Sequence, residues 1–198
     1  MNKKDCSLRP LQTNDWDPSL KHILSQMNNK PLNIHKLMAN HPKLLSAWWN
    51  FRNYSVLGGD LGRRKGELVI LRVASKLKSW YEWSSHVDRS LQCGLSLKEI
   101  KKVNAALVED DWSEEDFLLL SSVDMLIIKK TIKTEQYKEL RKYFSDQQVM
   151  DIIAIHGMYI TLSCMIDIYG LELEEEITKR LPNEINKKSF FKTNASSP

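Results

Sequence analysis

The run of residues 63–93 constrains the fold more than any other part of the sequence. It contains no proline and a single glycine, Gly66. Its apolar residues recur at helical spacing in two sets, Leu68, Leu71, Ala74 and Leu77, and Val69, Ile70 and Val73. A helix that is apolar on nearly every side is typical of the centre of a helical protein. Because a continuous helix of about 30 residues is longer than usual, we expect a break at residues 76–79.

A second helix is predicted over residues 42–57. Pro42 stands near its start and the pair Gly58-Gly59 follows its end, which is the asymmetry typical of helices. Aromatic side chains would cover more than one of its faces, namely Trp48, Trp49, Phe51 and Tyr54. We therefore expect this helix to be well buried.

Capping signals mark further helices. Ser96 and Ser145 each begin a capping box, and they predict helices that run to Val108 and Tyr169. Gly94 and Gly170 stand where a residue with left-handed backbone would end a helix.

Composition favours the same fold class. The 198 residues include only 7 Gly and 6 Pro, and we find no strand pattern longer than about four residues. A chain of this length can bury a sizeable core without disulfides. We predict an all-α protein with one domain over residues 16–181, built of two packed helical segments. Residues 1–15 and 182–198 are predicted to be a disordered arm and a disordered tail.

The distribution of charged residues and the number of cysteines indicate which partners and which cellular compartment to expect. The 29 basic and 25 acidic residues are interspersed, which does not build the one-sided field of a nucleic-acid-binding protein. Cys6, Cys93 and Cys164 have no metal-ligand spacing, which indicates free thiols and a reducing compartment. No apolar run follows the first lysines, so we expect no signal peptide and a cytoplasmic protein.

Two segments raise the question of membrane contact. Residues 149–171 lack Lys and Arg, yet they contain Asp151, His156 and Asp167, and their uninterrupted apolar part is shorter than the ~20 residues that a bilayer requires. We interpret this segment as a helix in the core or in a subunit interface, with no membrane partner. The tail surrounds Phe190-Phe191 with lysines, Lys187, Lys188 and Lys192. It could touch an anionic membrane, but we favour a solvated tail.

The sharpest local feature is the segment Trp80-Tyr81-Glu82-Trp83-Ser84-Ser85-His86. Glu82 and His86 share a helix face, with Cβ atoms ~5–6 Å apart, so they could share a proton or a water molecule. Aromatic neighbours would lower the local dielectric and shift both pKa values, which suits a general acid/base pair. The alternative is an exposed helix pair that contributes about 0.2–0.5 kcal/mol to stability.

Other residues that could form a catalytic or metal-binding centre do not have the spacing that such a centre requires. Cys93 lies about 10 Å along the helix from His86, too far for a nucleophile–base pair, and we expect it to be a small core residue. His156 is predicted to be a core histidine. There is no HExxH motif, and His22, His35 and His41 are not spaced as ligands. We expect no metal and no cofactor.

The sequence from His41 to Glu174 resembles the carboxymuconolactone decarboxylase family, which includes the alkylhydroperoxidase D proteins. The resemblance rests on HPKLLSAWW at 41–49, GRRKGELVILRVA at 62–74, YEWSSH at 81–86, SLQCGLSLKEI at 90–100 and WSEED at 112–116. It implies an alkylhydroperoxidase D-like helical fold, assembly as trimers or hexamers, and sites near subunit contacts.

The resemblance also allows this sequence to be aligned with the catalytic motif of the family. The peroxidase members have Cys-x-x-Cys-x-x-x-His on one helix and a glutamate on the preceding helix. Alignment on His86 places the two cysteines on Ser79 and Glu82 and the glutamate on Glu67. A serine and a carboxylate cannot cycle through a disulfide, so this chain is similar to a branch without the CxxC motif.

We therefore predict a cofactor-free decarboxylase or related lyase that acts on a small organic acid or lactone. His86 would donate the proton, Glu82 would orient it or act as base, and Glu67 would be a second acid/base group. The pocket would be shaped by Ser79, Tyr81, Trp83 and Tyr159. The alternatives are an alkylhydroperoxidase-type antioxidant enzyme and a non-catalytic oligomeric binding protein. A buried, satisfied Glu82–His86 pair without a cavity would favour the binding protein.

We also predict a homo-oligomer. Trp48, Trp49, Trp80 and Trp83, with the apolar segment 149–171, present more hydrophobic surface than one small helical domain hides.

The purified protein should not reduce hydroperoxides with a dithiol reductant, because that chemistry needs an attacking thiolate and a second, resolving thiol. The measurement is peroxide consumption by the wild type and by a Cys93→Ser, Cys164→Ser double variant. Rapid turnover by the wild type that is lost in the double variant would contradict the prediction.

Overall fold

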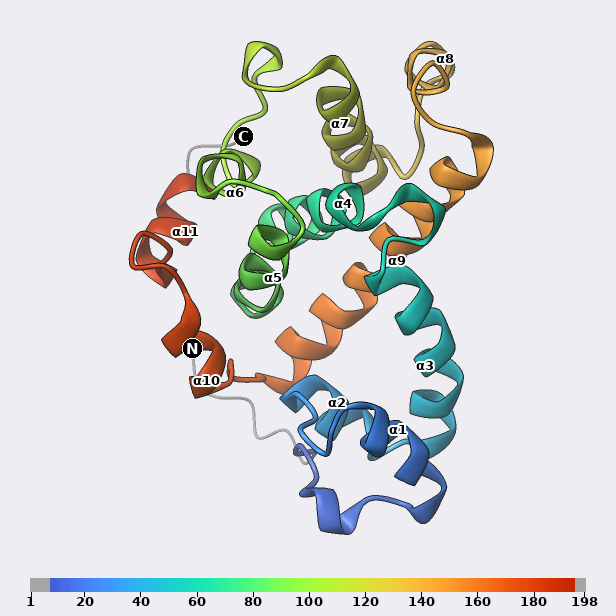
Figure 1. Cartoon of the computed structure of the whole chain (residues 1–198), viewed down its shortest axis with the longest axis vertical. Helices are drawn as coiled ribbons and strands as arrows, with labels where there is room; N and C mark the ends of the chain where they lie inside the picture. Colours follow the sequence, from blue (N-terminus) through green and yellow to red (C-terminus); the bar gives the residue numbers. More distant parts are fainter. Residues whose placement is uncertain (1–7, 195–198) are drawn as a thin grey trace.

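The computed structural model describes residues 8–194, and within that range the chain is all-helical, without a strand (Figure 1). The α-helices are α1 (Lys21–Gln26), α2 (Asn33–Met38), α3 (Pro42–Val56), α4 (Arg63–Lys76), α5 (Trp80–Gln92), α6 (Leu97–Val103), α7 (Glu114–Lys129), α8 (Thr134–Leu140), α9 (Asp146–Tyr169), α10 (Glu175–Arg180) and α11 (Lys187–Asn194). Short 3₁₀ helices are η1 (Thr13–Asp15), η2 (Pro18–Leu20), η3 (Gly59–Leu61) and η4 (Glu109–Asp111). The predicted fold class is confirmed.

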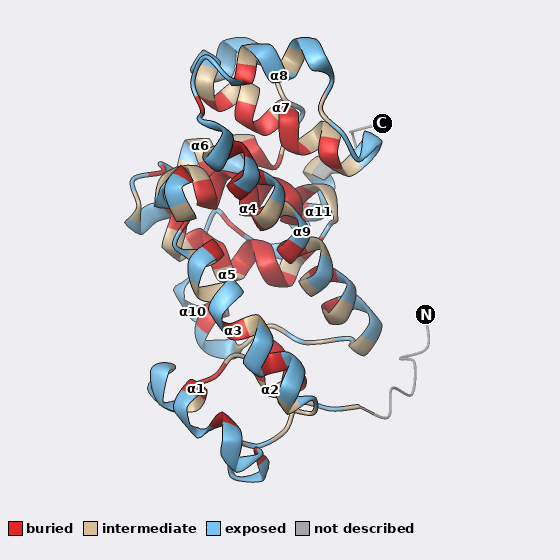
Figure 2. Ribbon diagram, turned by 90° about the vertical axis from the view of Figure 1, so that its right-hand side faces the viewer, coloured by how far each residue is buried: buried red, intermediate tan, exposed pale blue. Residues whose placement is uncertain are grey.

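Helix α4 lies at the centre of the molecule. Every residue from Gly66 to Ser75 is buried, and α4 packs against α5, α7 and α9. Figure 2 shows this buried centre as a red zone between exposed outer helices. The apolar pattern on nearly all sides of α4 is thus explained by neighbours on nearly all of its sides.

The break between α4 and α5 falls where the sequence predicts it. Lys78 has left-handed backbone with φ 56°, and the Ser79 amide donates to the Ala74 carbonyl over 2.8 Å. This tight turn satisfies the last carbonyl groups of α4 and folds α5 back against it. As a result, residues early in α4 lie beside residues in the middle of α5.

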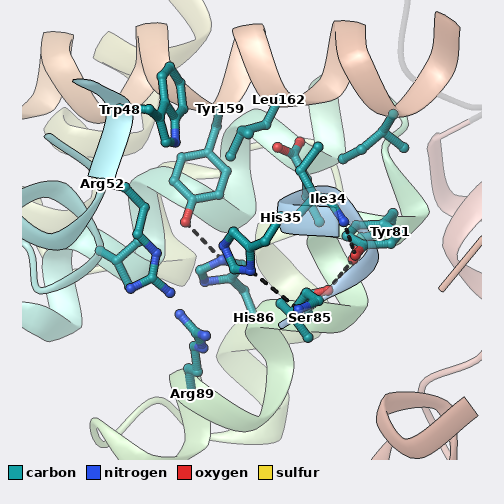
Figure 3. Close-up of a pocket in the computed structure, with 14 residues that line it drawn as sticks. Ile34, His35, Trp48, Arg52, Tyr81, Ser85, His86, Arg89, Tyr159 and Leu162 are labelled. Carbon is teal, nitrogen blue, oxygen red and sulfur yellow. Dashed lines mark hydrogen bonds between the residues drawn. The ribbon is translucent and has the colours of Figure 1, made fainter. Parts of the chain in front are cut away.

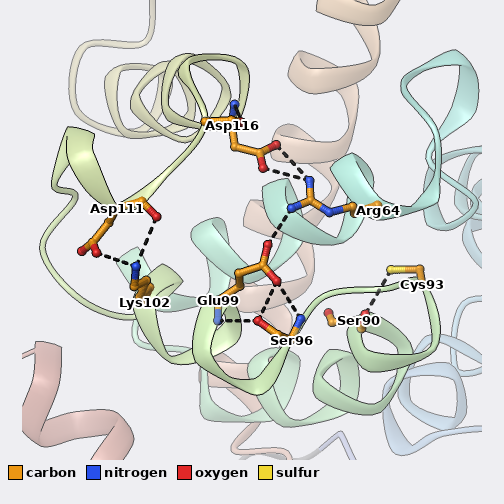
Figure 4. A network of polar contacts seen from close by, with 9 residues as sticks. Arg64, Ser90, Cys93, Ser96, Glu99, Lys102, Asp111 and Asp116 are labelled. Atoms are coloured by element: carbon orange, nitrogen blue, oxygen red, sulfur yellow. Dashed lines mark hydrogen bonds and ion pairs between the residues drawn. The ribbon is translucent and has the colours of Figure 1, made fainter.

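Arginines of α4 connect it to α6 and α7. Arg72 is buried, binds both carboxylate oxygens of Asp124 at 2.7 and 2.6 Å, and donates to the Val103 and Ala105 carbonyls. Arg64 bridges Glu99 of α6 and Asp116 of α7 (Figure 4). The buried charge of Arg72 is therefore paired and hydrogen-bonded, as low-dielectric surroundings require.

The predicted capping boxes are confirmed at Ser96 and Ser145. Gly94 and Gly170 have φ of 96° and 59°, which confirms their positions at helix ends. The predicted end at Val108 is wrong, because α6 stops at Val103. The two carbonyl groups that bind Arg72 lie at and just beyond this end, so the chain leaves the helix where it closes around the guanidinium.

Helix α9 is both a core element and an outer wall. Its buried Asp151 accepts hydrogen bonds from Tyr54 Oη (2.8 Å) and from the backbone amides of Asp60 and Leu61 (2.7 and 3.1 Å). Within the described part of the chain, α9 is the one helix long and apolar enough to cross a membrane, a criterion that core helices also meet. Asp151 here fixes the corner between α3 and α4.

The predicted disordered ends are wrong for the residues that the structure describes. Residues 187–194 form α11, and the Phe190 ring is buried against Trp80 and Trp83, with ring centroids 5.5 and 5.4 Å away. Near the other end, the Leu11 amide donates to the Lys36 carbonyl of α2. A single aromatic anchor in a lysine-rich tail outweighs the local polar composition. Residues 1–7, including Cys6, and 195–198 lie outside the described residues.

The expectation that α3 is well buried holds for only part of it. Trp49 is buried, but Phe51, Tyr54 and the following Leu57 are exposed in this single chain. The aromatic residues of α3 therefore cover both an inner and an outer face, and the outer face lies open to solvent.

Three hydrophobic clusters make up the interior. The largest surrounds α4, a second joins α1, α2 and α3 around Trp49, and a third surrounds Ile34 and Tyr81. Leu162 of α9 packs against all three clusters. The clusters consequently meet beside α9, and the cavity described below lies at this junction.

Gly66 is the residue of α4 whose replacement tests the corner between η3 and α4. A Cβ atom there would lie 2.9 Å from the Gly58 Cα, and both partners are backbone, so Gly66→Ala should lower the free energy of unfolding by about 1–3 kcal/mol. Gly157→Ala is the matched control, since nothing lies within 4 Å of its Cβ and alanine favours helix by about 1 kcal/mol. Urea denaturation of both variants measures the difference. Equal stability of the two would contradict the close packing of Gly58 and Gly66.

Candidate active site

A small cavity of about 50 Å³ lies where α2, α3, α5 and α9 meet. Its polar lining includes His35, Arg52, Glu82, His86, Arg89 and Tyr159. Its apolar lining includes Trp48, Leu162 and Ile166. Figure 3 shows these side chains converging from four helices. An apolar cavity with a few convergent polar groups is the usual form of a small-molecule site.

A chain of hydrogen bonds links three helices at this cavity. The Glu67 carboxylate of α4 accepts from His86 Nδ1 of α5 over 2.7 Å. On the other side of the ring, His86 Nε2 lies 2.8 Å from Tyr159 Oη of α9. With the proton of the imidazole held on Nδ1 by Glu67, Nε2 accepts from the tyrosine hydroxyl. We call Glu67, His86 and Tyr159 the relay.

Burial keeps the relay in defined protonation states. Desolvation lowers the pKa of His86, against the opposing effect of Glu67, so the ring is neutral at pH 7. Desolvation and the nearby Glu67 charge raise the pKa of Tyr159 well above its ordinary value. The phenol therefore carries its proton and the imidazole can accept it.

Glu82 lies on the same cavity but outside the relay. Its Oε2 forms a hydrogen bond with Ser163 Oγ of α9, whereas its buried Oε1 has no partner among the described residues. Burial raises its pKa to about 8, although the Ser163 hydrogen bond opposes the shift. At neutral pH Glu82 is thus a protonated carboxylic acid at the cavity wall, next to a neutral imidazole.

The structure brings some of the predicted site residues together and separates others. Tyr81, Glu82, His86 and Tyr159 line the cavity, and Glu67 lies behind His86. The predicted Glu82–His86 pair is wrong: each group bonds to a different helix, Glu82 to Ser163 and His86 to Glu67. Helical spacing places two side chains on one face, but the partners that α4 and α9 supply decide which bonds form.

Two predicted pocket residues do not line this cavity. Trp83 faces the other side of α5 and packs on Phe190 of α11. Ser79 is the buried residue that precedes α5, and its hydroxyl lies close enough to Glu82 to oppose the rise in the pKa of that carboxyl group. Both belong to the packing of α5 rather than to the cavity wall.

Sequence reasoning missed several residues of the site, namely His35, Trp48, Arg52, Arg89 and Ser163. The position of Arg89 at the cavity could have been predicted from the sequence, because it follows His86 by three residues and Glu82 by seven and so shares their helix face. The sequence gives no such indication for Arg52 and His35, because only the tertiary packing of α3 and α2 brings these residues to the cavity.

The thiols lie away from the cavity. Cys93 ends α5, is partly buried and donates to the Ser90 carbonyl, and burial raises its pKa. Cys164 is exposed on α9. Between residues 8 and 194 no cluster of three or more His, Cys, Asp or Glu side chains is placed to hold a metal ion. His156 is half-buried, and its Nε2 has no partner among these residues.

Residues 42–115 match the carboxymuconolactone decarboxylase family. Over these residues the chain is similar to this family. The matched segment contains α3 to α6 and therefore Arg52, Glu67, Glu82, His86 and Arg89. Tyr159 and Ser163, which complete the hydrogen bonds, lie outside it. No curated protein matches the chain significantly.

Solved structures share the fold of this chain. A cysteine-to-alanine variant of the debrominase Bmp8, in complex with 2,3,4-tribromopyrrole, superposes with a TM-score of 0.75 at 15% identity, covering 90% of this chain and 97% of that one. An uncharacterized peroxidase-related protein from Silicibacter sp. TM1040 gives 0.72 at 17% identity, covering 89% and 97%. A peroxidase-related protein with an alkylhydroperoxidase AhpD core, from Ralstonia eutropha JMP134, gives 0.72 at 15% identity, covering 86% and 94%. These similarities show the fold.

The raised pKa of Glu82 should make stability depend on pH. In the unfolded chain Glu82 loses its proton above its ordinary pKa of 4.5, whereas in the folded protein it keeps the proton until the pH approaches about 8. The contribution of Glu82 to the free energy of unfolding is therefore full below pH 4.5 and is lost as the pH rises toward about 8. Relative to Glu82→Gln, which stays neutral, the wild type should lose free energy of unfolding across this window. Urea denaturation at several pH values measures it, with the exposed Glu184→Gln as control. A constant difference between the wild type and Glu82→Gln would show that Glu82 is ionised throughout.

Proposed function

We propose that the protein is a cofactor-free decarboxylase or related lyase acting on a small organic acid or lactone. The observation that carries the proposal is the pairing, in one cavity, of a neutral carboxylic acid, Glu82, with a base relay that ends at Tyr159. Acid and base groups kept in opposite roles by their surroundings are typical of proton-transfer enzymes. The similarity of residues 42–115 to the carboxymuconolactone decarboxylase family supports the proposal.

Glu82 is the proton donor in the decarboxylation step. The bond between the carboxylate and its carbon breaks, CO₂ leaves, and the electron pair stays on that carbon and spreads into an adjacent carbonyl group. Glu82 then transfers its proton to the carbon and recovers one from water. The Oε1 atom supports this role, because it has no hydrogen-bond partner among residues 8–194 and a substrate can occupy that position.

The relay serves as the base in a related lyase step. Tyr159 accepts a proton from a carbon next to the carbonyl and passes its own to His86 Nε2, and Glu67 stabilises the imidazolium that results. The electron pair of the broken C–H bond forms a double bond to the neighbouring carbon, whose leaving group departs with its own electron pair and takes the proton of Glu82. The sequence-based expectation that His86 donates the proton is replaced here, because Nε2 is an acceptor in the resting site.

The alternatives are less well supported. Neither Cys93 nor Cys164 lines the cavity, which speaks against an alkylhydroperoxidase-type enzyme that uses these thiols. A non-catalytic binding protein would need no unpaired acid at a cavity wall, yet Glu82 Oε1 is one.

We also propose that the protein assembles as a homo-oligomer, in line with the resemblance to trimeric and hexameric proteins. The outer face of α9 exposes large apolar side chains, with Met150, Ile153 and Ile168 exposed to 68%, 47% and 57%. Phe51 and Leu57 of the α3 region add to this exposed apolar surface. A second copy of the chain would cover it.

The enzymatic proposal is tested with a panel of small keto acids and unsaturated lactone acids in D₂O, followed by proton NMR. We expect loss of CO₂ with deuterium incorporation at the vacated carbon. Glu82→Gln should lower the rate by about 10²–10⁴-fold, the usual contribution of a general acid, while Glu184→Gln keeps it. Turnover of no member of the panel, or full activity of Glu82→Gln, would refute the proposal.

The assembly proposal is tested by light scattering. The wild type should have a mass that is a multiple of 23.1 kDa at micromolar concentration. Ile153→Glu should lower that mass, because a charge would be desolvated at the interface, and Lys101→Glu on α6 should not. A wild-type mass of one chain would contradict the assembly.

A further inference from the structure

Two arginines face each other at the cavity without an ionic partner among residues 8–194. Arg52 comes from α3 and Arg89 from α5, and their guanidinium groups point toward one another below Tyr159 and His86 (Figure 3). Arg52 donates to Asn53 Oδ1 over 2.9 Å and lies 5.0 Å from the Trp49 ring centroid. Neither arginine forms an ion pair with any residue between 8 and 194.

The surrounding groups do not balance these two positive charges. Glu67 binds His86, and Glu82 is held neutral by burial. His35, which also lines the cavity, is neutral because burial and both arginines lower its pKa to about 3. Lys30 adds a further positive charge at the outer hollow next to the cavity. The site therefore holds an excess of positive charge.

Elsewhere the chain pairs its inward-facing arginines with carboxylates. Arg72 binds Asp124 through two hydrogen bonds, and Arg64 binds both Glu99 and Asp116. Two guanidinium groups that repel each other in a partly buried site are unfavourable unless an anion joins them. The contrast indicates that no carboxylate between residues 8 and 194 balances the charge of Arg52 and Arg89.

We propose that Arg52 and Arg89 together bind one carboxylate group of a small organic anion at the mouth of the cavity. Each guanidinium offers a planar fork of N–H donors that matches a carboxylate. The two arginines line both the inner cavity and an outer hollow of about 390 Å³, so the anion enters from the hollow and stops between them. The rest of the molecule extends between Trp48 and Leu162 toward Tyr159.

Under the proposed function, on which this step rests, the bound carboxylate is one that the substrate keeps. An ion pair with the departing carboxylate would stabilise the reactant and would be lost as neutral CO₂ forms, which slows the reaction. The substrate therefore carries a second acidic group besides the one that leaves. One acidic group anchors the molecule at the arginines and the other end meets Glu82 and Tyr159.

A bound anion would also raise the pKa of His86 in the relay. Both arginines lower the pKa of His86, so neutralising them makes the imidazole a stronger base. The base strength of the relay then rises when substrate is in place.

The test is isothermal titration of the full-length protein with succinate and acetate, at constant ionic strength, with succinamide as the neutral counterpart. Succinate should bind and succinamide should not. Arg52→Gln and Arg89→Gln should each weaken succinate binding about tenfold or more, as expected for loss of a charge-assisted contact. Arg180→Gln, which replaces an arginine at a neighbouring hollow, should leave binding unchanged.

Equal binding of succinate by the wild type and both cavity variants, or no binding by the wild type, would overturn the carboxylate site.

Titration with sulfate and phosphate separates a carboxylate site from a general anion site, since tighter binding of phosphate than of either carboxylate would also overturn the inference. The titration needs no turnover. Arginine-dependent binding without CO₂ release would refute the proposed function alone, and CO₂ release without arginine dependence would refute this inference alone.

Discussion

The complete burial of α4 is the constraint from which the site follows. A helix surrounded on nearly every side has no water for its polar side chains, so each must meet a partner from another helix. Arg72 does so with Asp124, and Glu67 does so with His86. The first bond joins α4 to α7, and the second fixes the ring of His86 and directs its other nitrogen at Tyr159. The same requirement that stabilises the core thus orients the base.

Two carboxyl groups near one cavity are driven to opposite roles by their partners. Glu67 is an acceptor for an imidazole N–H, whereas Glu82 has a serine hydroxyl on one oxygen and nothing on the other. Burial without a cationic partner raises the pKa of Glu82, although Arg52 and Arg89 line the same cavity. The two guanidinium groups point toward one another (Figure 3), and among the described residues neither forms an ion pair with Glu82.

Local signals in the sequence predicted the helices well because caps and turns depend on neighbouring residues. The break before Trp80 and the ends at Gly94 and Gly170 are of this kind. The candidate site was predicted in part: the resemblance placed Glu67 beside His86, but spacing alone paired His86 with Glu82. Ser163 and Arg52 come from α9 and α3, and no periodicity within α5 could name them. The ordered tail was missed for the same reason, since Phe190 is anchored by Trp83 from far along the chain.

The glycine corner between α3 and α4 has a consequence for how such a protein can change. Gly66 lets the backbone of Gly58 approach closely, and Asp151 holds the adjoining turn. Arg52 lies on α3 just before this corner, while Arg89 lies on α5, which is packed against α4. The gap between the two guanidinium groups therefore depends on how this corner holds α3 against α4, although Gly58, Gly66 and Asp151 do not line the cavity. Mutations there would retune the size of accepted molecules while every reacting group keeps its identity, which makes the corner a starting point for laboratory evolution of new substrate ranges.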